Sequence, residues 1–169
     1  MRLFGCFLLI LSALPALLPA QASAEEKVTI EELNWLDNSY LEKQVARVDE
    51  LGRSEFGIPV RGDKSDLELL QRIIYRGLIP KDDSLRLQAL GVVLGNVMVK
   101  ELGLEWKKYT DKLGSSRAAC IPGTQECLFP VTMLSRRMEV GLMPDVARIY
   151  GEAQDMIKPF QPKLPYQVN

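Results

Sequence analysis

The 169-residue sequence contains no histidine and only three cysteines. Without an imidazole, the chain cannot perform Ser-His-Asp or Cys-His catalysis, and it cannot form a zinc or iron site that needs a histidine ligand. Cys6 lies in the apolar leader described below, so only Cys120 and Cys127 remain, too few for a four-thiolate site. We therefore expect no metal, no cofactor and no enzymatic activity.

A surplus of charge is also absent. The sequence has 21 basic and 22 acidic residues, a formal net charge of −1. A nucleic-acid-binding domain would carry a basic surplus gathered on one face, which argues against nucleic acid. The balance also gives no electrostatic reason to bind anionic lipid. The partner that we expect is another protein.

Apolar runs as long as a signal peptide requires are missing except at the N-terminus. Met1 and Arg2 precede an apolar stretch over residues 3–18, and Ala22-Ser23-Ala24 has the small-x-small form that signal peptidase accepts. This pattern predicts a Sec signal peptide over residues 1–24, cleaved after Ala24, and a mature protein that is periplasmic or secreted. A spanning helix needs about 20 apolar residues, so a retained membrane anchor is the less favoured alternative.

Residues 25–158 predict a single α+β domain. Thr29-Ile30-Glu31-Glu32 and Ser65-Asp66-Leu67-Glu68 are capping boxes, which predict that helices begin at these two places. Apolar residues recur at helical spacing in four to five segments. These segments are about 29–54, 65–77, 83–103, 131–138 and 145–158. The proline-rich residues 159–169 predict an extended tail.

The segment over residues 89–99 is apolar on nearly every side, which is typical of a helix in the middle of a domain. Gly91 and Gly95 lie on one face of this helix and would let a neighbouring backbone come close. Asn96 is the polar residue of the run, and we expect it to meet a backbone group.

Features typical of β structure are confined to residues 104–129, where three strands are predicted. They are 104–110, 116–121 and 126–129. We expect a small three-stranded antiparallel meander on which the helices pack. If residues 122–125 close the second hairpin, Cys120 faces Cys127 directly, and export would allow a disulfide between them. A redox-active pair is the alternative, although such cysteines usually have two residues between them.

Aromatic residues make up only 7% of the chain. Aromatic and arginine side chains carry most of the binding energy at protein interfaces, and arginine pairs well with carboxylate or phosphate. We take as candidate binding residues Tyr109, Arg117, Arg136 and Arg137. Trp106 belongs to the same group, but a core position between sheet and helices explains it better.

Glu105, Asp111 and Glu126 lie near the predicted sheet. A pair of carboxylates could act as general acid and base without histidine. No spacing among these three indicates the separation that such chemistry needs, and each is also ordinary at an exposed strand or turn position. An acid-pair hydrolase acting on an envelope polymer remains an alternative function.

Four segments of the chain resemble a bacterial family, the DUF3806 domain of unknown function. They are LELLQRII, LQALGVVLGNVMVKELGLEW, the PGT turn and LFPVTMLSRRMEVG. The resemblance covers about Val48 to Ile157 and implies a compact α+β domain, without an activity or a catalytic residue. In the family pattern a lysine more often fills the place of Arg136, and the hairpin carries no cysteine pair, so the disulfide would be an addition of this chain.

Together these observations predict an exported, non-enzymatic protein-binding or accessory module of the bacterial cell envelope. A periplasmic inhibitor or immunity protein against a toxin or lysozyme is an alternative that fits the same chain length and cellular location.

Overall fold

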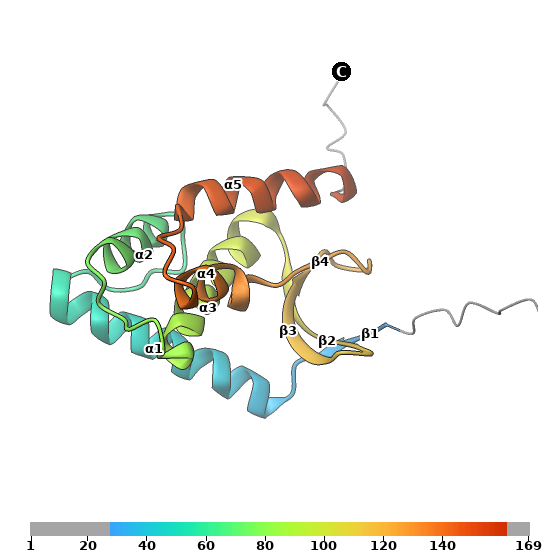
Figure 1. Ribbon diagram of the computed structural model, residues 1–169. Coiled ribbons are helices and arrows are strands. Elements are labelled where there is room, and N and C mark those ends of the chain that lie inside the picture. The colour runs from blue at the N-terminus through green and yellow to red at the C-terminus, as the bar shows by residue number, and fades with distance from the viewer. Residues whose placement is uncertain (1–27, 162–169) are drawn as a thin grey trace, which may run out of the picture.

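The computed structural model describes residues 28–161 as five α-helices and a short 3-10 helix with a four-stranded antiparallel sheet (Figure 1). The predicted α+β class is confirmed. The predicted signal peptide and residues 162–169 of the predicted tail lie outside the described residues. No helix within residues 28–161 is long and apolar enough to cross a membrane.

The sheet has the order β1-β2-β3-β4, and each neighbouring pair is antiparallel. Its strands are β1 (Thr29–Glu32), β2 (Glu105–Asp111), β3 (Gly114–Cys120) and β4 (Cys127–Leu128). The predicted meander corresponds to β2, β3 and β4. The strand β1 adds a fourth member beside β2.

The capping box at Thr29 does not begin a helix, so that prediction was wrong. These residues form β1 and pair with β2, with Ile30 opposite Tyr109. The first helix, α1 (Trp35–Phe56), begins after Asn34. The Oδ1 of Asn34 accepts a hydrogen bond from the Asp37 N–H at 2.9 Å and caps the helix. The local sequence favours a helix that begins at Thr29, but pairing of these residues with the distant strand β2 outweighs that preference.

Local signals place the other helices close to where they were predicted. They are α2 (Ser65–Tyr75), α3 (Ser84–Leu102), α4 (Pro130–Glu139), α5 (Val146–Ile157) and the short 3-10 helix η1 (Lys158–Phe160). Asp83 and Asp145 cap α3 and α5, because their carboxylates accept the N–H groups of Arg86 and Arg148.

The helix α3 is buried along most of its length, as its apolar sequence predicts. A Cβ on Gly91 would lie 2.4 Å from the carbonyl oxygens of Pro130 and Val131, and one on Gly95 would lie 2.3 Å from the Trp106 ring. The two glycines thus let α4 and β2 pack directly on α3, which confirms the predicted close approach.

Trp106 anchors the sheet on α3. Its Nε1–H donates a hydrogen bond to Asn96 Oδ1 at 2.8 Å. The prediction that Asn96 meets a backbone group was therefore wrong, because its side-chain oxygen accepts the hydrogen bond of the Trp106 indole instead. This contact and the packing on Gly95 make Trp106 a structural residue.

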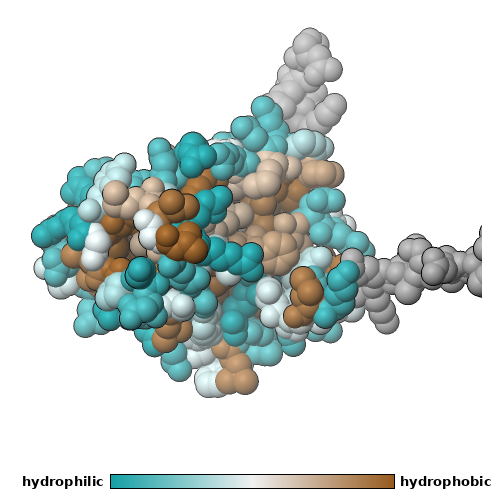
Figure 2. Space-filling model, viewed as in Figure 1, coloured by the Kyte–Doolittle hydropathy of each residue, from teal (hydrophilic) through white to brown (hydrophobic). Residues whose placement is uncertain are grey.

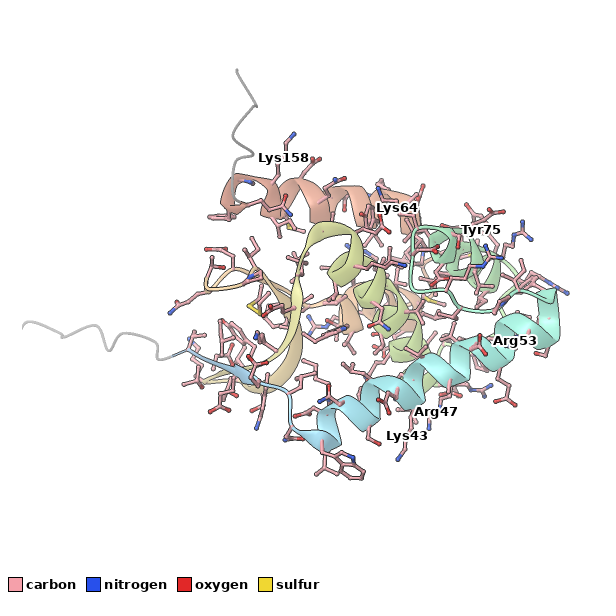
Figure 3. The ribbon with its side chains drawn as sticks, turned by 180° about the vertical axis from the view of Figure 1, so that it is seen from behind. Lys43, Arg47, Arg53, Lys64, Tyr75 and Lys158 are labelled. Atoms are coloured by element: carbon pink, nitrogen blue, oxygen red, sulfur yellow. A yellow bond between two sulfur atoms is a disulfide. The ribbon has the colours of Figure 1, made fainter. Side chains whose placement is uncertain are left out.

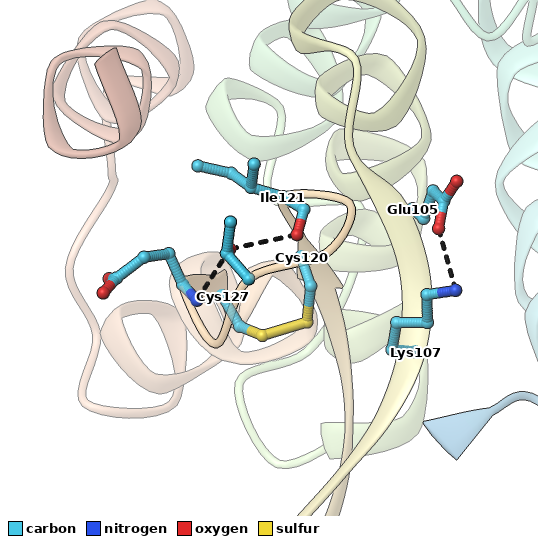
Figure 4. The surroundings of a disulfide bond; sticks show 7 residues. Glu105, Lys107, Cys120, Ile121 and Cys127 are labelled. Carbon is cyan, nitrogen blue, oxygen red and sulfur yellow. Dashed lines mark hydrogen bonds and ion pairs between the residues drawn. A yellow bond between two sulfur atoms is a disulfide. The ribbon is translucent and has the colours of Figure 1, made fainter. Parts of the chain in front are cut away.

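Cys120 and Cys127 are opposite each other and form a disulfide (Figure 4). The Ile121 N–H donates to the Glu126 carbonyl at 2.9 Å and closes the loop between them as predicted. The strand β4 ends at Leu128, so it covers only the last two residues of β3.

Candidate functional site

A groove of about 530 Å³ opens where α1, α3, α4 and the β2–β3 hairpin meet. We call it the hairpin groove. Its lining includes Tyr40, Gln88, Tyr109, Arg117, Phe129 and Arg136. Three of the four candidate binding residues predicted from the sequence therefore lie along one groove.

Arg137, the fourth candidate, is not part of the described lining of the groove. Its Nη1 donates to the carbonyl oxygen of Met133, one turn earlier in α4. Consecutive residues of a helix point about 100° apart, at 3.6 residues per turn, so Arg136 and Arg137 cannot share one direction. Arg136 therefore lines the groove while Arg137 points elsewhere, and a binding role for Arg137 stays a prediction.

Arg117 is the most constrained side chain of the groove. Its Nη2 lies 2.8 Å from Asp37 Oδ1, and its guanidinium carbon lies 3.9 Å from the centre of the Tyr40 ring. The Tyr40 hydroxyl in turn donates to Gln88 Oε1 at 3.2 Å. Because the ring of Tyr40 supports the guanidinium by a cation–π contact, Arg117 is held in a defined position. Its side chain is still 30% exposed.

The pairing of Arg117 with Asp37 is incomplete. Arg117 Nε and Asp37 Oδ2 are both buried and have no hydrogen-bond partner within the described part of the chain. Arginine and carboxylate can form two parallel hydrogen bonds, which is the stronger arrangement. A buried polar atom without a partner costs about 1–3 kcal/mol. The geometry at Arg117 is therefore not the one that stability alone would favour.

Tyr109 and Arg117 leave the sheet on opposite faces. Tyr109 is paired with Ser116 and Arg117 with Lys108, so the two side chains lie at alternate positions of the ladder. The Tyr109 ring meets Phe129 edge to face, with the ring centres 5.1 Å apart. The groove thus has an aromatic side at Tyr109 and a charged side at Arg117.

Asp37, Tyr40 and Phe129 were not among the residues predicted for the site. Tyr40 fits the apolar helical spacing of α1, which by itself predicts a core position. Asp37 and Phe129 lie far from Arg117 along the chain. Their positions follow from how α1 and α4 pack against the hairpin, and only the aromatic character of Tyr40 and Phe129 gave a signal in the sequence.

The three carboxylates considered as acid and base are spread along the hairpins. Glu105 and Asp111 begin and end β2, about 20 Å apart at the ordinary rise of a strand. Acid pairs of glycosidases lie about 5 to 9.5 Å apart. Glu105 lies 2.8 Å from Lys107 (Figure 4), and hydrogen bonds from Lys107 to Glu105 and Glu32 raise the pKa of the lysine. Glu126 is exposed in the loop before β4.

Two other cavities, of about 490 and 310 Å³, are lined mainly by residues of α1, and the described lining of neither includes a candidate binding residue. Seen from behind, Lys43, Arg47 and Arg53 follow α1 (Figure 3), and the described lining of the groove includes none of them. Arg53 pairs with Asp49 at 2.6 Å. Figure 2 shows hydrophobic residues in separate areas with hydrophilic residues between them. The hairpin groove is therefore the candidate site.

The fold is similar to that of a solved structure. The crystal structure of a protein from Bacteroides thetaiotaomicron VPI-5482 matches with a TM-score of 0.69 and 20% sequence identity, over 80% of this chain and 51% of that chain. At this identity the likeness shows the fold alone, and this chain spans about half the length of that protein. No curated protein matches the chain.

The domain of unknown function DUF3806 matches residues 66–150. This region includes α3, the meander and α4, and therefore Tyr109, Arg117 and Arg136. Asp37 and Tyr40, the contacts of Arg117 on α1, precede it. Because the match covers half of the sequence, as the resemblance of its segments predicted, the chain belongs to the DUF3806 family.

Proposed function

We propose that the chain is a non-enzymatic protein-binding module of the bacterial cell envelope, and that an acidic segment of its partner lies in the hairpin groove. The observation that carries this proposal is Arg117. Its guanidinium is held on the Tyr40 ring and beside Asp37, while 30% of its side chain remains exposed. A fixed arginine beside aromatic rings is typical of the centre of a protein interface.

The charges around Arg117 support an acidic partner. A smaller cavity of about 130 Å³ adjoins it, lined by Asp37, Lys108, Ser115, Ser116 and Arg117. The groove and this cavity together present three cationic side chains and two carboxylates. The surplus of positive charge would attract an acidic segment and orient it.

Exposed apolar side chains near the groove support a protein partner. Leu113, at the turn of the hairpin, is 87% exposed, and Phe129 is 37% exposed. Trp35 and Leu36, which directly precede Asp37, are 76% and 68% exposed. Large apolar side chains that remain exposed together are typical of interaction surfaces.

The envelope location rests on the predicted leader, and the disulfide is compatible with an oxidising compartment. We expect the protein purified after expression of the full sequence in a bacterial host to begin at Glu25. Mass spectrometry of the intact protein measures this. A purified chain that retains residues 1–24 would contradict the location.

The binding surface can be tested with two neighbouring arginines. We expect Arg136→Glu to abolish capture of the partner from a periplasmic extract, because Arg136 lines the groove. Arg137→Glu makes the same change of charge outside the groove and should capture the partner as the wild type does. Equal capture by the two variants, whether retained or lost, would contradict the hairpin groove as the binding site.

The captured protein also separates the alternatives. If it is a toxin or lysozyme that loses activity in the complex, the module is an inhibitor or immunity protein. Turnover of an envelope polymer by the purified chain alone would contradict a non-enzymatic role.

A further inference from the structure

One edge of β3 is open along most of its length. The strand β4 pairs only with Ala119 and Cys120. Residues 114–118 pair with β2 on one side, and no strand of the described sheet covers their other side. After Leu128 the chain turns away into α4, and Phe129, Val131 and Thr132 line the hairpin groove together with these β3 residues. The groove therefore lies along the part of β3 that β4 is too short to cover.

The direction of the backbone groups on this edge follows from the ladder. The N–H of Ile121 donates to Glu126, so the polar groups of residue 121 point toward the β4 side. Along an antiparallel strand, alternate residues direct both N–H and C=O to the same side. Residues 119, 117 and 115 therefore point the same way. Beyond the end of β4, Ser115 and Arg117 direct two donors and two acceptors to the open edge.

We propose that the partner adds an extended segment to β3 as a strand that pairs with Ser115 and Arg117 inside the hairpin groove. Open strand edges bind extended peptides in this way, with main-chain hydrogen bonds giving affinity and alternate side chains giving specificity. This inference rests on the proposed function and specifies how the partner is bound.

The two faces of the sheet define the pattern of the added strand. Arg117 and Lys108 lie on one face, and Tyr109 and Ser116 on the other. A residue opposite Arg117 would be acidic. The residues on either side of it would be apolar, because Ser116 is small and leaves room for them to reach the Tyr109 and Phe129 rings. The occupant is thus a segment of another protein in which acidic and apolar residues alternate.

A second copy of the chain fits this edge less well. Antiparallel pairing of two β3 strands about Ser116 would place Arg117 of each copy opposite Ser115 of the other, on the same face. The two guanidinium groups would then approach each other, and like charges on neighbouring strands are destabilising.

Hydrogen exchange followed by NMR tests the mode of binding. The probe is a blocked pentapeptide that alternates valine and glutamate, added to the exported protein. We expect the amides of Ser115 and Arg117 to exchange rapidly in the free protein and to become protected in the complex. The amides of Ser116 and Ala118, which already face β2, should change little. A peptide of the same composition with the valines first, and an analogue with lysine in place of glutamate, should bind roughly tenfold more weakly.

A proline at the open edge provides the matched variant. Ser115→Pro removes the donor that faces the groove, and proline is tolerated on strand edges where its N–H would face solvent. Ser115→Ala keeps the donor, and both variants lose the hydroxyl contact with Thr110. We expect Ser115→Pro to fold and to lose the peptide, while Ser115→Ala binds as the wild type does. The far-ultraviolet circular dichroism of the two variants reports whether both have folded.

Three outcomes of these experiments would contradict strand addition at β3. Peptide binding without protection of the Ser115 and Arg117 amides would overturn strand addition and leave the groove as a side-chain site. Absence of binding by the alternating peptide, or equal binding of all three peptides, would also overturn it. Protection that rises with protein concentration in the absence of peptide, with a dimer in sedimentation, would identify a second copy as the occupant instead. In each case the capture test with Arg136 and Arg137 still decides the proposed function separately.

Discussion

At the scale of single residues, Asp49 joins α1 to the segment that follows it. Its carboxylate accepts hydrogen bonds from the Arg53 side chain at 2.6 Å and from the Val60 N–H at 2.8 Å. These two hydrogen bonds, of which the one from Arg53 has the larger effect, lower the pKa of Asp49 below the ordinary value of 3.8. Because they favour the ionised form only in the folded protein, their contribution to stability is complete above pH 3.8 and is lost as the pH falls through the lowered pKa.

We therefore expect Asp49→Asn to reduce the free energy of unfolding at neutral pH, and the difference from wild type to shrink as the pH falls below 3.8. Urea unfolding at several pH values measures this. Glu50→Gln, on the same helix, is the control and should show a smaller difference at neutral pH. A deficit of Asp49→Asn that stays constant down to acid unfolding would contradict the account.

Residue type alone singled out Tyr109, Arg117 and Arg136, and the structure places all three along the hairpin groove, while their binding role stays a prediction. Their partners could not be predicted. Asp37 and Tyr40 reach Arg117 only because α1 packs beside the hairpin, and nothing in their own neighbourhood in the sequence indicates that contact. The different directions of Arg136 and Arg137 follow from the turn of about 100° between consecutive helical residues, which the predicted helix over residues 131–138 already implied.

At the scale of secondary-structure elements, Gly95 sets the distance between α3 and β2. A methyl group at this position would meet the Trp106 ring at 2.3 Å. We expect Gly95→Ala to reduce the free energy of unfolding by about 1 to 3 kcal/mol, the usual cost of overpacking. Urea unfolding followed by tryptophan fluorescence provides the measurement.

Gly151 in α5 is the matched control, because a Cβ there would have no neighbour within 4 Å. Gly151→Ala should raise the free energy of unfolding by about 0.5 to 1 kcal/mol, since alanine is the better helix former. Destabilisation by both substitutions to the same extent would mean that helix-wide effects, and not the Trp106 contact, decide the outcome.

The helices α2 to α5 could be predicted because their apolar periods are local properties of the sequence, as are the aspartate caps of α3 and α5. The strand β1 could not be predicted, because nothing in its four residues indicates a partner strand far along the chain. Its Glu32 contacts Lys107, 75 positions away. The same reason explains why the meander was predicted correctly. Its strands follow one another, so turns and alternation suffice.

At the scale of the whole molecule, the disulfide links two strands that already lie side by side. We expect the double variant Cys120→Ala, Cys127→Ala to keep the fold and to lose about 2 to 3 kcal/mol of unfolding free energy, because the unfolded chain is no longer constrained. Urea unfolding with and without a reductant measures this. The reductant should lower the stability of the wild type alone, and an equal effect on the double variant would contradict the explanation.

The pairing of β1 with β2 also has a consequence for the order of folding. The strand β1 precedes α1, α2 and α3 along the chain, yet its hydrogen-bonding partners in β2 lie beyond all three helices. Closing so long a loop is slow compared with forming contacts inside a helix or a hairpin. We therefore expect β1 to stay unpaired while α1, α2 and α3 form, and the sheet to become complete only when β2 pairs with β1.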